Sequence, residues 1–185
     1  MNQDKNIERL YSLVELVHHR WNIPIIAELH RQSGAKFVTL ASSLGVGRAS
    51  LSASLSDLIK LGFVVRNSGH GHPMRPEYLL TEAGKAIGND CLSLRHLLRR
   101  RKEEGIAYRK WTLPLVAAIG NENRRFNEVQ IILPAASPRA ITLGLKAMLA
   151  ERWALRSLID NFPPTAAYAL LPKGRSVLNH VAQLY

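Results

Sequence analysis

The side chains with the clearest chemical potential in this sequence are its lysines and arginines, which bind phosphate and other anions. The chain carries 25 of them against 14 acidic residues, which gives a formal net charge of +11. The positive charge is concentrated in the second half of the chain, since residues 91–185 contain 15 basic and six acidic residues. This balance favours a polyanionic partner, either nucleic acid or an anionic membrane surface. Charge alone does not decide between them, so the elements that present it must be considered.

Metal and catalytic chemistry find weak support in the sequence. The pairs His18-His19 and His70-Gly71-His72 have no cysteine or carboxylate cluster at ligand spacing beside them, so we expect no metal site. The sequence has no Ser–His–acid motif, no phosphate-binding glycine loop and no framed carboxylate pair. We therefore expect no enzyme and no cofactor. Cys91 is expected to be a small buried apolar side chain rather than a redox sensor.

The compartment is indicated by the same composition. With a single cysteine, the chain forms no intrachain disulfide, which fits a reducing cytoplasm. The N-terminal sequence MNQDKNIER is polar, and the sequence has no run of about 18 uncharged apolar residues. We therefore expect no membrane span, no secretory signal and no membrane partner.

The sequence repeats itself with a shift of 90 residues. The shift carries Trp21 onto Trp111, and the register slips by one residue where Phe37 matches Phe126. A period of this length is typical of a small domain copied once. We predict a first domain over residues 1–92 and a second over 93–185, joined through a basic linker helix. The same shift relates Pro24 to Pro114, Ala27 to Ala117, Leu55 to Leu145, Arg66 to Arg156, Pro73 to Pro163, Tyr78 to Tyr168, Leu80 to Leu170 and Gly84 to Gly174.

Capping residues and apolar spacing predict the elements of the first copy. Asn22 is expected to cap a first helix, and a short helix over 37–44 ends at Gly45, which suits a tight turn. A further helix over about 48–61 should bury the stripe Leu51, Leu55, Leu58 and Ile59. Residues 63–66 and 77–80 are predicted strands around a turn-rich loop, after which Thr81 caps a long helix.

This order of elements is that of a winged helix-turn-helix domain, in which the hairpin is the wing. The helix over 48–61 would place small polar side chains in the major groove, and the wing would donate to phosphate or to the minor groove. The candidate DNA-binding residues of the first copy are Arg48, Ser50, Ser52, Ala53 and Ser56 on the helix, and Arg66, His70, His72 and Arg75 on the wing.

The second copy predicts the same order. Thr112 is expected to cap its first helix, and Ser137 and Pro138 open the helix that corresponds to 48–61. The residues expected in the core of that helix are Ile141, Leu145, Met148 and Leu149, and those expected to face DNA are Arg139, Thr142 and Lys146. Trp153 should begin the first wing strand and Pro172 the last helix. We also expect Trp21, Trp111, Phe37 and Phe126 to be core residues.

Each copy resembles the HxlR family of bacterial winged-helix transcriptional regulators. The segments that carry the resemblance are RWNIPIIAEL, KWTLPLVAAI, RRFNEV, ASPRAITLGLKAML, HPMRPEYLLTEAGKAI and FPPTAAYALLPKG. The resemblance covers residues 10–95 and 100–180 and implies DNA binding. Family members usually carry one such domain and bind DNA as homodimers, so the fused copies imply a built-in pseudo-dimer.

These observations predict a mainly α protein with small β-hairpin wings (α+β) that consists of two tandem winged helix-turn-helix domains. We expect a cytoplasmic, nucleoid-associated transcriptional regulator that binds double-stranded DNA sequence-specifically through two unequal reading heads. The alternative is a winged-helix adaptor that binds protein in a DNA-organising complex, which the apolar second wing over 157–167 favours. A small-molecule effector and a homodimer of the whole chain both remain open.

Overall fold

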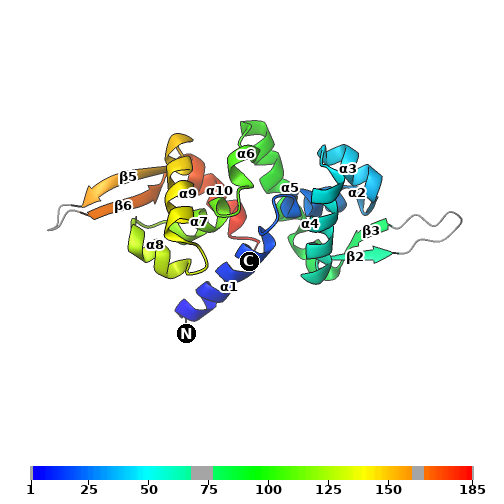
Figure 1. Cartoon of the computed structure of the whole chain (residues 1–185), viewed down its shortest axis with the longest axis horizontal. Helices are drawn as coiled ribbons and strands as arrows, with labels where there is room; N and C mark the ends of the chain where they lie inside the picture. Colours follow the sequence, from blue (N-terminus) through cyan, green and yellow to red (C-terminus); the bar gives the residue numbers. More distant parts are fainter. Residues whose placement is uncertain (1, 68–76, 160–164, 185) are drawn as a thin grey trace, which may run out of the picture. The chain divides into compact units, whose positions relative to one another are not determined.

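The computed structural model describes residues 2–67, 77–159 and 165–184 of the chain. These residues form two compact units, each with helices and a small antiparallel sheet (Figure 1). We call residues 16–101 with Leu184 the first-repeat unit, and residues 2–15 with 102–183 the second-repeat unit. No helix in the described part of the chain is long and apolar enough to cross a membrane.

The first-repeat unit follows the predicted order of elements. The helix α2 lies along α5 and also contacts α3 and α4, so its apolar residues form the centre of the core. Ile25, Ile26 and Leu29 of α2 are buried there together with Leu94 and Leu98 of α5. The elements are α2 (Asn22–Gln32), β1 (Ala35–Lys36), α3 (Phe37–Leu44), α4 (Arg48–Lys60), β2 (Val64–Asn67), β3 (Glu77–Leu80) and α5 (Glu82–Arg101).

The second-repeat unit repeats this order around α7, which contacts α8, α9 and α10. Its elements are α1 (Asn2–Leu16), α6 (Glu104–Ala107), α7 (Thr112–Ile119), β4 (Arg124–Arg125), α8 (Phe126–Ile132), α9 (Pro138–Ala150), β5 (Ala154–Ile159), β6 (Thr165–Leu170) and α10 (Pro172–Val181). The predicted fold is confirmed: the chain consists of two tandem winged helix-turn-helix units, mainly α with small β-hairpins.

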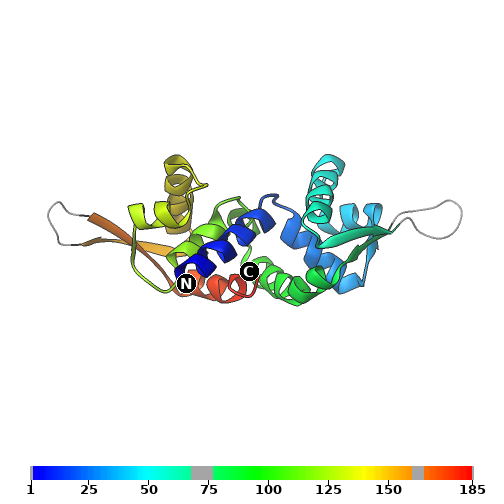
Figure 2. The ribbon, with the colours of Figure 1, turned by 90° about the horizontal axis from the view of Figure 1, so that it is seen from below.

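Each sheet contains a strand that the sequence did not indicate. Within the described residues the strand orders are β1-β3-β2 and β4-β6-β5, so a two-residue strand before α3 or α8 pairs with the returning strand of the hairpin. The β1–β3 and β4–β6 pairings are both antiparallel, and Figure 2 shows the β5–β6 hairpin extending well beyond α9. The added strands anchor the base of each wing beside the helix-turn-helix.

The helices α1 and α5 show how the two repeats are divided between the units. A shift of 90 residues carries α10 back to residues 82–91 and carries α1 forward to residues 92–106. The long helix α5 therefore joins the last helix of the first repeat to the first helix of the second repeat. Residues 92–101 belong to the first-repeat unit, whereas α1 up to residue 15 belongs to the second-repeat unit. Each unit thus contains the first helix of the other repeat.

Within the second-repeat unit, α1 packs through its apolar residues. Leu10 and Leu13 are buried, and Leu10, Tyr11 and Val14 line one small hollow with residues 132–135. The compact units therefore do not follow the order of the repeats along the sequence. The predicted domain boundary between residues 92 and 93 describes the two sequence repeats, and it stays a prediction.

Two of the predicted helix caps are wrong, and the reason is burial. Trp21 and Trp111 occupy the N-cap positions of α2 and α7, while Asn22 and Thr112 are buried in the first turn. Asn22 Nδ2 donates to the carbonyl oxygen of Leu16 at 2.9 Å and to Asp57 Oδ2 at 2.8 Å. Asn22 therefore joins three helices instead of capping one.

The other two predicted caps are confirmed. The Thr81 hydroxyl oxygen accepts a hydrogen bond from the Gly84 amide at 3.1 Å, and the Ser137 hydroxyl oxygen accepts one from the Ala140 amide at 3.2 Å. These bonds satisfy amide groups in the first turns of α5 and α9, which have no partner inside the helix. Pro138 occupies the first turn of α9, as predicted.

Burial also departs from the prediction at some apolar positions. Ile59 is 40% exposed, and Leu149, Phe37 and Phe126 are only half-buried. Both tryptophans of the repeat signature are half-buried under cations: Arg20 lies 5.7 Å from the Trp21 ring centre, and Lys110 lies 5.3 Å from the Trp111 ring centre. Trp153 is fully buried instead and directly precedes β5.

Candidate nucleic-acid interface

All five candidate residues of α4 lie on its exposed face. Arg48, Ser50, Ser52, Ala53 and Ser56 are exposed. The opposite face carries the buried side chains that hold the helix, namely Leu51, Ser54, Leu55 and Leu58. A helix fixed on one side, with small side chains on the other, can place its backbone close to the base edges of a major groove. The structure therefore brings these five residues together on one surface.

Asp57 does not belong to that surface. Its carboxylate accepts the hydrogen bond from Asn22 Nδ2, and its side chain is half-buried. The negative charge that would repel phosphate is thus held toward α2 and away from the serines. This contact explains how a helix with an aspartate in its last turns can still present a neutral and basic face.

The corresponding face of α9 is more basic and more apolar. Arg139 and Lys146 are exposed, and Thr142 is half-buried with its hydroxyl donating to the Pro138 carbonyl oxygen at 2.8 Å. The opposite stripe is buried through Ile141, Leu145 and Met148. The α9 helix also packs closely on α7, because a Cβ atom on Gly144 would collide with the side chain of Leu115.

Leu143 is a residue of this face that the sequence reasoning missed. Its side chain is 57% exposed, and the shift of 90 residues places it at the position of Ala53. Ile131 on α8 is 76% exposed. The repeat register could have identified Leu143, since Ala53 was already a candidate and the two positions correspond.

In both units, the first strand of the wing carries an arginine at the same position of the hairpin. Arg66 on β2 lies opposite Tyr78 on β3, and Arg156 on β5 lies opposite Tyr168 on β6. Both arginine side chains are exposed. Arg66 was a predicted contact, and the repeat shift could have added Arg156. The other predicted wing residues, His70, His72 and Arg75, lie outside the described residues.

Behind the α4 surface, a buried ion pair fixes α2 to α5. Glu28 Oε2 accepts from Arg95 Nη1 at 2.6 Å, and Glu28 Oε1 accepts from Arg31 Nη2 at 2.6 Å. Burial by itself would raise the pKa of Glu28, but hydrogen bonds from Arg31, Arg95 and Gln32 and the charge of Arg95 together lower that pKa to about 2. The carboxylate is therefore ionised at neutral pH and holds the helix pair that supports the helix-turn-helix.

The described residues offer little for other chemistry. In that part of the chain, no three His, Cys, Asp or Glu side chains cluster closely enough to hold a metal ion. Cys91 is buried on α5, and burial raises the pKa of its thiol well above the ordinary value, with a further contribution from the charge of Asp90. A protonated, enclosed thiol reacts slowly, which agrees with the predicted role as an apolar side chain.

Comparison with known proteins places the chain among helix-turn-helix regulators. An HTH-type transcriptional regulator of Mycobacterium tuberculosis, MT3179, is 40% identical over 74 residues, which is 40% of this chain and 46% of the relative. The chain thus spans about half the length of that relative. YvaP of Bacillus subtilis, also an HTH-type transcriptional regulator, is 29% identical over 79 residues, which is 43% of this chain and 73% of YvaP.

Solved structures show partial similarity. A transcriptional regulator of the MarR family from Porphyromonas gingivalis aligns with a TM-score of 0.43 and 26% identity, over 46% of this chain and 83% of its own. Reduced YodB from B. subtilis aligns with a TM-score of 0.42 and 16% identity, over 46% of this chain and 84% of its own.

The family assignment rests on the whole chain. The family model described as HxlR-like helix-turn-helix matches residues 16–104 and again residues 106–185. Two consecutive matches agree with the shift of 90 residues and with the two winged units of the structure. The chain therefore belongs to the HxlR-like helix-turn-helix family, and it carries the family's domain twice.

Proposed function

We propose that this chain is a transcriptional regulator that binds double-stranded DNA through the exposed faces of α4 and α9. The proposal rests on one observation that both units share. Each unit presents an exposed helix face, on α4 or α9, together with an exposed wing arginine, Arg66 or Arg156, that lies opposite a tyrosine of the returning strand. Helix and wing together would contact base edges and flanking phosphates, which is how winged helix-turn-helix proteins read DNA. The net charge of +11 supports the same partner.

The two reading heads are unequal in chemistry. The α4 face offers three serines and Ala53, which suit hydrogen bonds and close approach. The α9 face offers Arg139, Lys146 and Leu143, which suit phosphate or guanine contacts and an apolar contact to a thymine methyl group. Two unequal heads in one chain favour an asymmetric site over an inverted repeat of identical half-sites. We place this activity in the cytoplasm, on the nucleoid, with no catalytic role.

The proposal is tested by selecting the full chain on random-sequence duplex DNA at several salt concentrations. We expect enrichment of an asymmetric site and a steep fall of affinity with salt. The double variant R139A/K146A should lower the log–log salt slope by about two units, because each lost phosphate contact removes about one. Arg109→Ala removes an exposed cation outside the proposed surface and serves as the control. A shallow slope without enrichment would refute the proposal.

A second function is favoured by the apolar side chains of the second-repeat unit. Ile131 is 76% exposed, Leu158 is 69% exposed and Leu143 is 57% exposed, and exposed apolar side chains suit a protein-binding surface. Under this alternative the unit would serve as an adaptor in a DNA-organising complex. Leu143→Ser distinguishes the two: a changed base preference supports DNA reading, whereas unchanged DNA binding by this variant supports the adaptor.

A further inference from the structure

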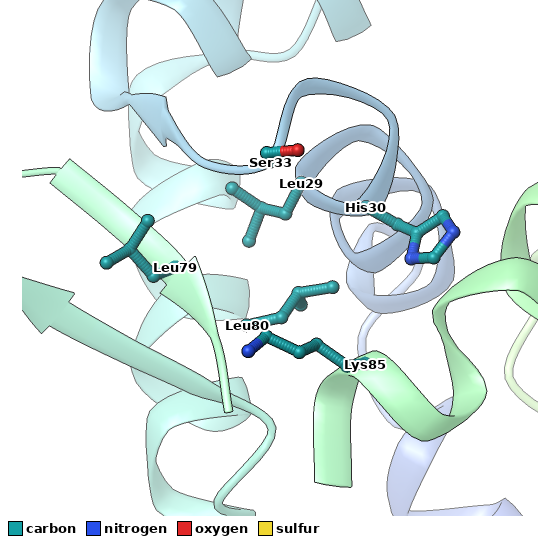
Figure 3. Close-up of a pocket in the computed structure, with 6 residues that line it drawn as sticks. All are labelled: Leu29, His30, Ser33, Leu79, Leu80 and Lys85. Atoms are coloured by element: carbon teal, nitrogen blue, oxygen red, sulfur yellow. The ribbon is translucent and has the colours of Figure 1, made fainter. Parts of the chain in front are cut away.

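A cavity that is open to solvent lies in the first-repeat unit between the end of α2, the strand β3 and the start of α5, with Ser33 and Lys85 exposed at its edge. Its volume is about 510 Å³, within the range of small-molecule sites. Figure 3 shows the residues that line it: Leu29, His30, Ser33, Leu79, Leu80 and Lys85. Among the described residues, none of the DNA-contact candidates lines it, and the α4 candidates lie on a different surface of the unit.

The lining combines an apolar floor with polar groups at its edge. Leu29, Leu79 and Leu80 offer three branched apolar side chains from two elements. Lys85 brings a cation from α5, and Figure 3 shows its chain running past Leu80 with the amino group toward β3. A ligand with an apolar body and one negative charge matches this arrangement, since the body would cover the leucines while the charge meets Lys85.

The polar groups are available for such a ligand. Lys85 Nζ pairs with Glu82 Oε1 at 2.7 Å, but the Glu82 side chain is 91% exposed, so this pair is weak and readily exchanged. Among the described residues, neither the Ser33 hydroxyl nor the His30 ring forms a side-chain hydrogen bond that would have to be broken. Figure 3 shows Ser33, His30 and Lys85 at separate places around the cavity, so Lys85 is the group that would meet a carboxylate.

His30 is held in place by the close approach of α2 and α5. A Cβ atom on Gly88 would collide with the imidazole ring, so only glycine lets the ring lie against α5. The ring therefore lies between α5 and the cavity in this structure.

The second repeat reproduces these groups only in part. The shift of 90 residues pairs His30 with Gly120 and Lys85 with Arg175. Arg175 Nε donates to the carbonyl oxygen of Leu170 at 3.1 Å, so part of its guanidinium is committed to the backbone. The second repeat therefore keeps a cation at this position, but only the first copy has the imidazole and a lysine whose amino group makes no backbone hydrogen bond that the structure shows.

We propose that this cavity binds a small monocarboxylate with an apolar body of about six to ten carbon atoms, a size that the cavity volume accommodates. Its carboxylate lies at Lys85, and its body lies on Leu79 and Leu80. These leucines pair with Val65 and Val64 of β2, the strand that also carries Arg66. A bound ligand therefore contacts the sheet of the first wing. Any effect on DNA affinity rests on the proposed function, whereas binding itself does not.

The test is a titration of the full chain, without DNA, by benzoate and hexanoate, with benzamide and hexanamide as uncharged controls, followed by amide NMR shifts. We expect saturable binding of both carboxylates with a Kd on the order of 1 mM. Shifts should centre on β3 and the start of α5, and the amides should bind at least about tenfold more weakly.

Variants at an exposed position keep the test independent of folding. Lys85→Ala should weaken carboxylate binding about tenfold or more, Lys85→Arg should restore most of it, and Arg109→Ala should leave it unchanged. Equal binding of acids and amides, unchanged binding by Lys85→Ala, or no saturable binding by either carboxylate would each overturn the proposal. A separate titration with DNA present reports whether the ligand changes DNA affinity, and its failure would leave the ligand site intact.

Discussion

Arg95 and Glu28 form an ion pair, 2.6 Å between Nη1 and Oε2, in which both side chains are more than nine-tenths buried. The pair joins α5 to α2 across 67 positions of the sequence. A buried ion pair adds little net stability compared with apolar residues of the same shape. Removing one partner is costly, however, because the other charge is then buried without compensation. The pair therefore specifies how α2 and α5 align, and α2 in turn supports α3 and α4.

Removing one partner of this pair should destabilise the first-repeat unit strongly. We expect Arg95→Ala to lower the free energy of unfolding by about 3–5 kcal/mol, because it leaves the Glu28 carboxylate without its buried partner. Arg31→Ala is the matched control: Arg31 binds the same carboxylate, but its side chain is 54% exposed, so its loss should destabilise the unit far less than the loss of Arg95. Urea unfolding measures both, and equal losses would contradict the assigned roles.

Acid should act through the same carboxylate. The pKa of Glu28 lies at about 2 in the folded chain, below its ordinary value of 4.5. A lowered pKa stabilises the folded chain at every pH above the ordinary pKa of 4.5. This stabilisation is lost as the pH falls from about 4.5 toward 2. We expect the free energy of unfolding to fall over that range. In Glu28→Gln, which cannot titrate there, the fall should be smaller than in the parent chain.

The order of elements was predictable because local signals agree with one another. Glycines and caps separate segments whose apolar residues recur with helical or strand spacing, and the repeat supplies each signal twice. The exposed face of α4 follows directly from that spacing, since a buried stripe of leucines leaves Ser52 and Ser56 on the other side. The exposed face of α4, which we propose contacts DNA, was therefore predictable from local pattern alone.

The misses all depend on tertiary contacts. Asn22 has the chemistry of a cap, but its partners Leu16 and Asp57 come together only in the fold. The strands β1 and β4 have two residues each, too few for any alternation to show. Neither the Glu28–Arg95 pair nor the cavity at Lys85 has a local signature, because their residues lie far apart in the sequence.

A close approach repeated in both units gives a prediction about glycine. A Cβ atom on Gly84 would collide with the carbonyl oxygen of Phe63, and one on Gly174 would collide with that of Trp153. Backbone atoms cannot move aside cheaply, so we expect Gly84→Ala and Gly174→Ala each to destabilise its unit by about 1–3 kcal/mol.

The control for these variants is Gly105→Ala on α6, where no described atom lies within 4 Å of the new Cβ. This change should be neutral or stabilising, since alanine favours a helix over glycine. Thermal unfolding compares the three variants. If Gly105→Ala lowered the stability as much as Gly84→Ala does, the close approach to the Phe63 carbonyl would not be the cause of the destabilisation.

The thiol of Cys91 should be inert in the folded chain. Burial raises its pKa, and the thiolate is the reactive form, so both access and ionisation oppose reaction. We expect reaction with an aromatic disulfide reagent to be at least about a hundredfold slower than in urea, as the buried thiol reacts only through opening of the fold. Equal reaction rates of the Cys91 thiol in buffer and in urea would contradict this prediction and would support a role as a redox sensor.

The two wing arginines provide the last prediction, because the repeat makes each the control of the other. Arg66 and Arg156 are both exposed and both lie opposite a tyrosine of the returning strand. If both wings grip phosphate, Arg66→Ala and Arg156→Ala should each lower the log–log salt slope of DNA binding by about one unit. If only the first wing touches DNA, the slope falls for Arg66→Ala alone, and the apolar second wing is free for another partner. Unchanged slopes for both variants would remove the wings from the DNA interface and leave the helices α4 and α9 as its only candidates.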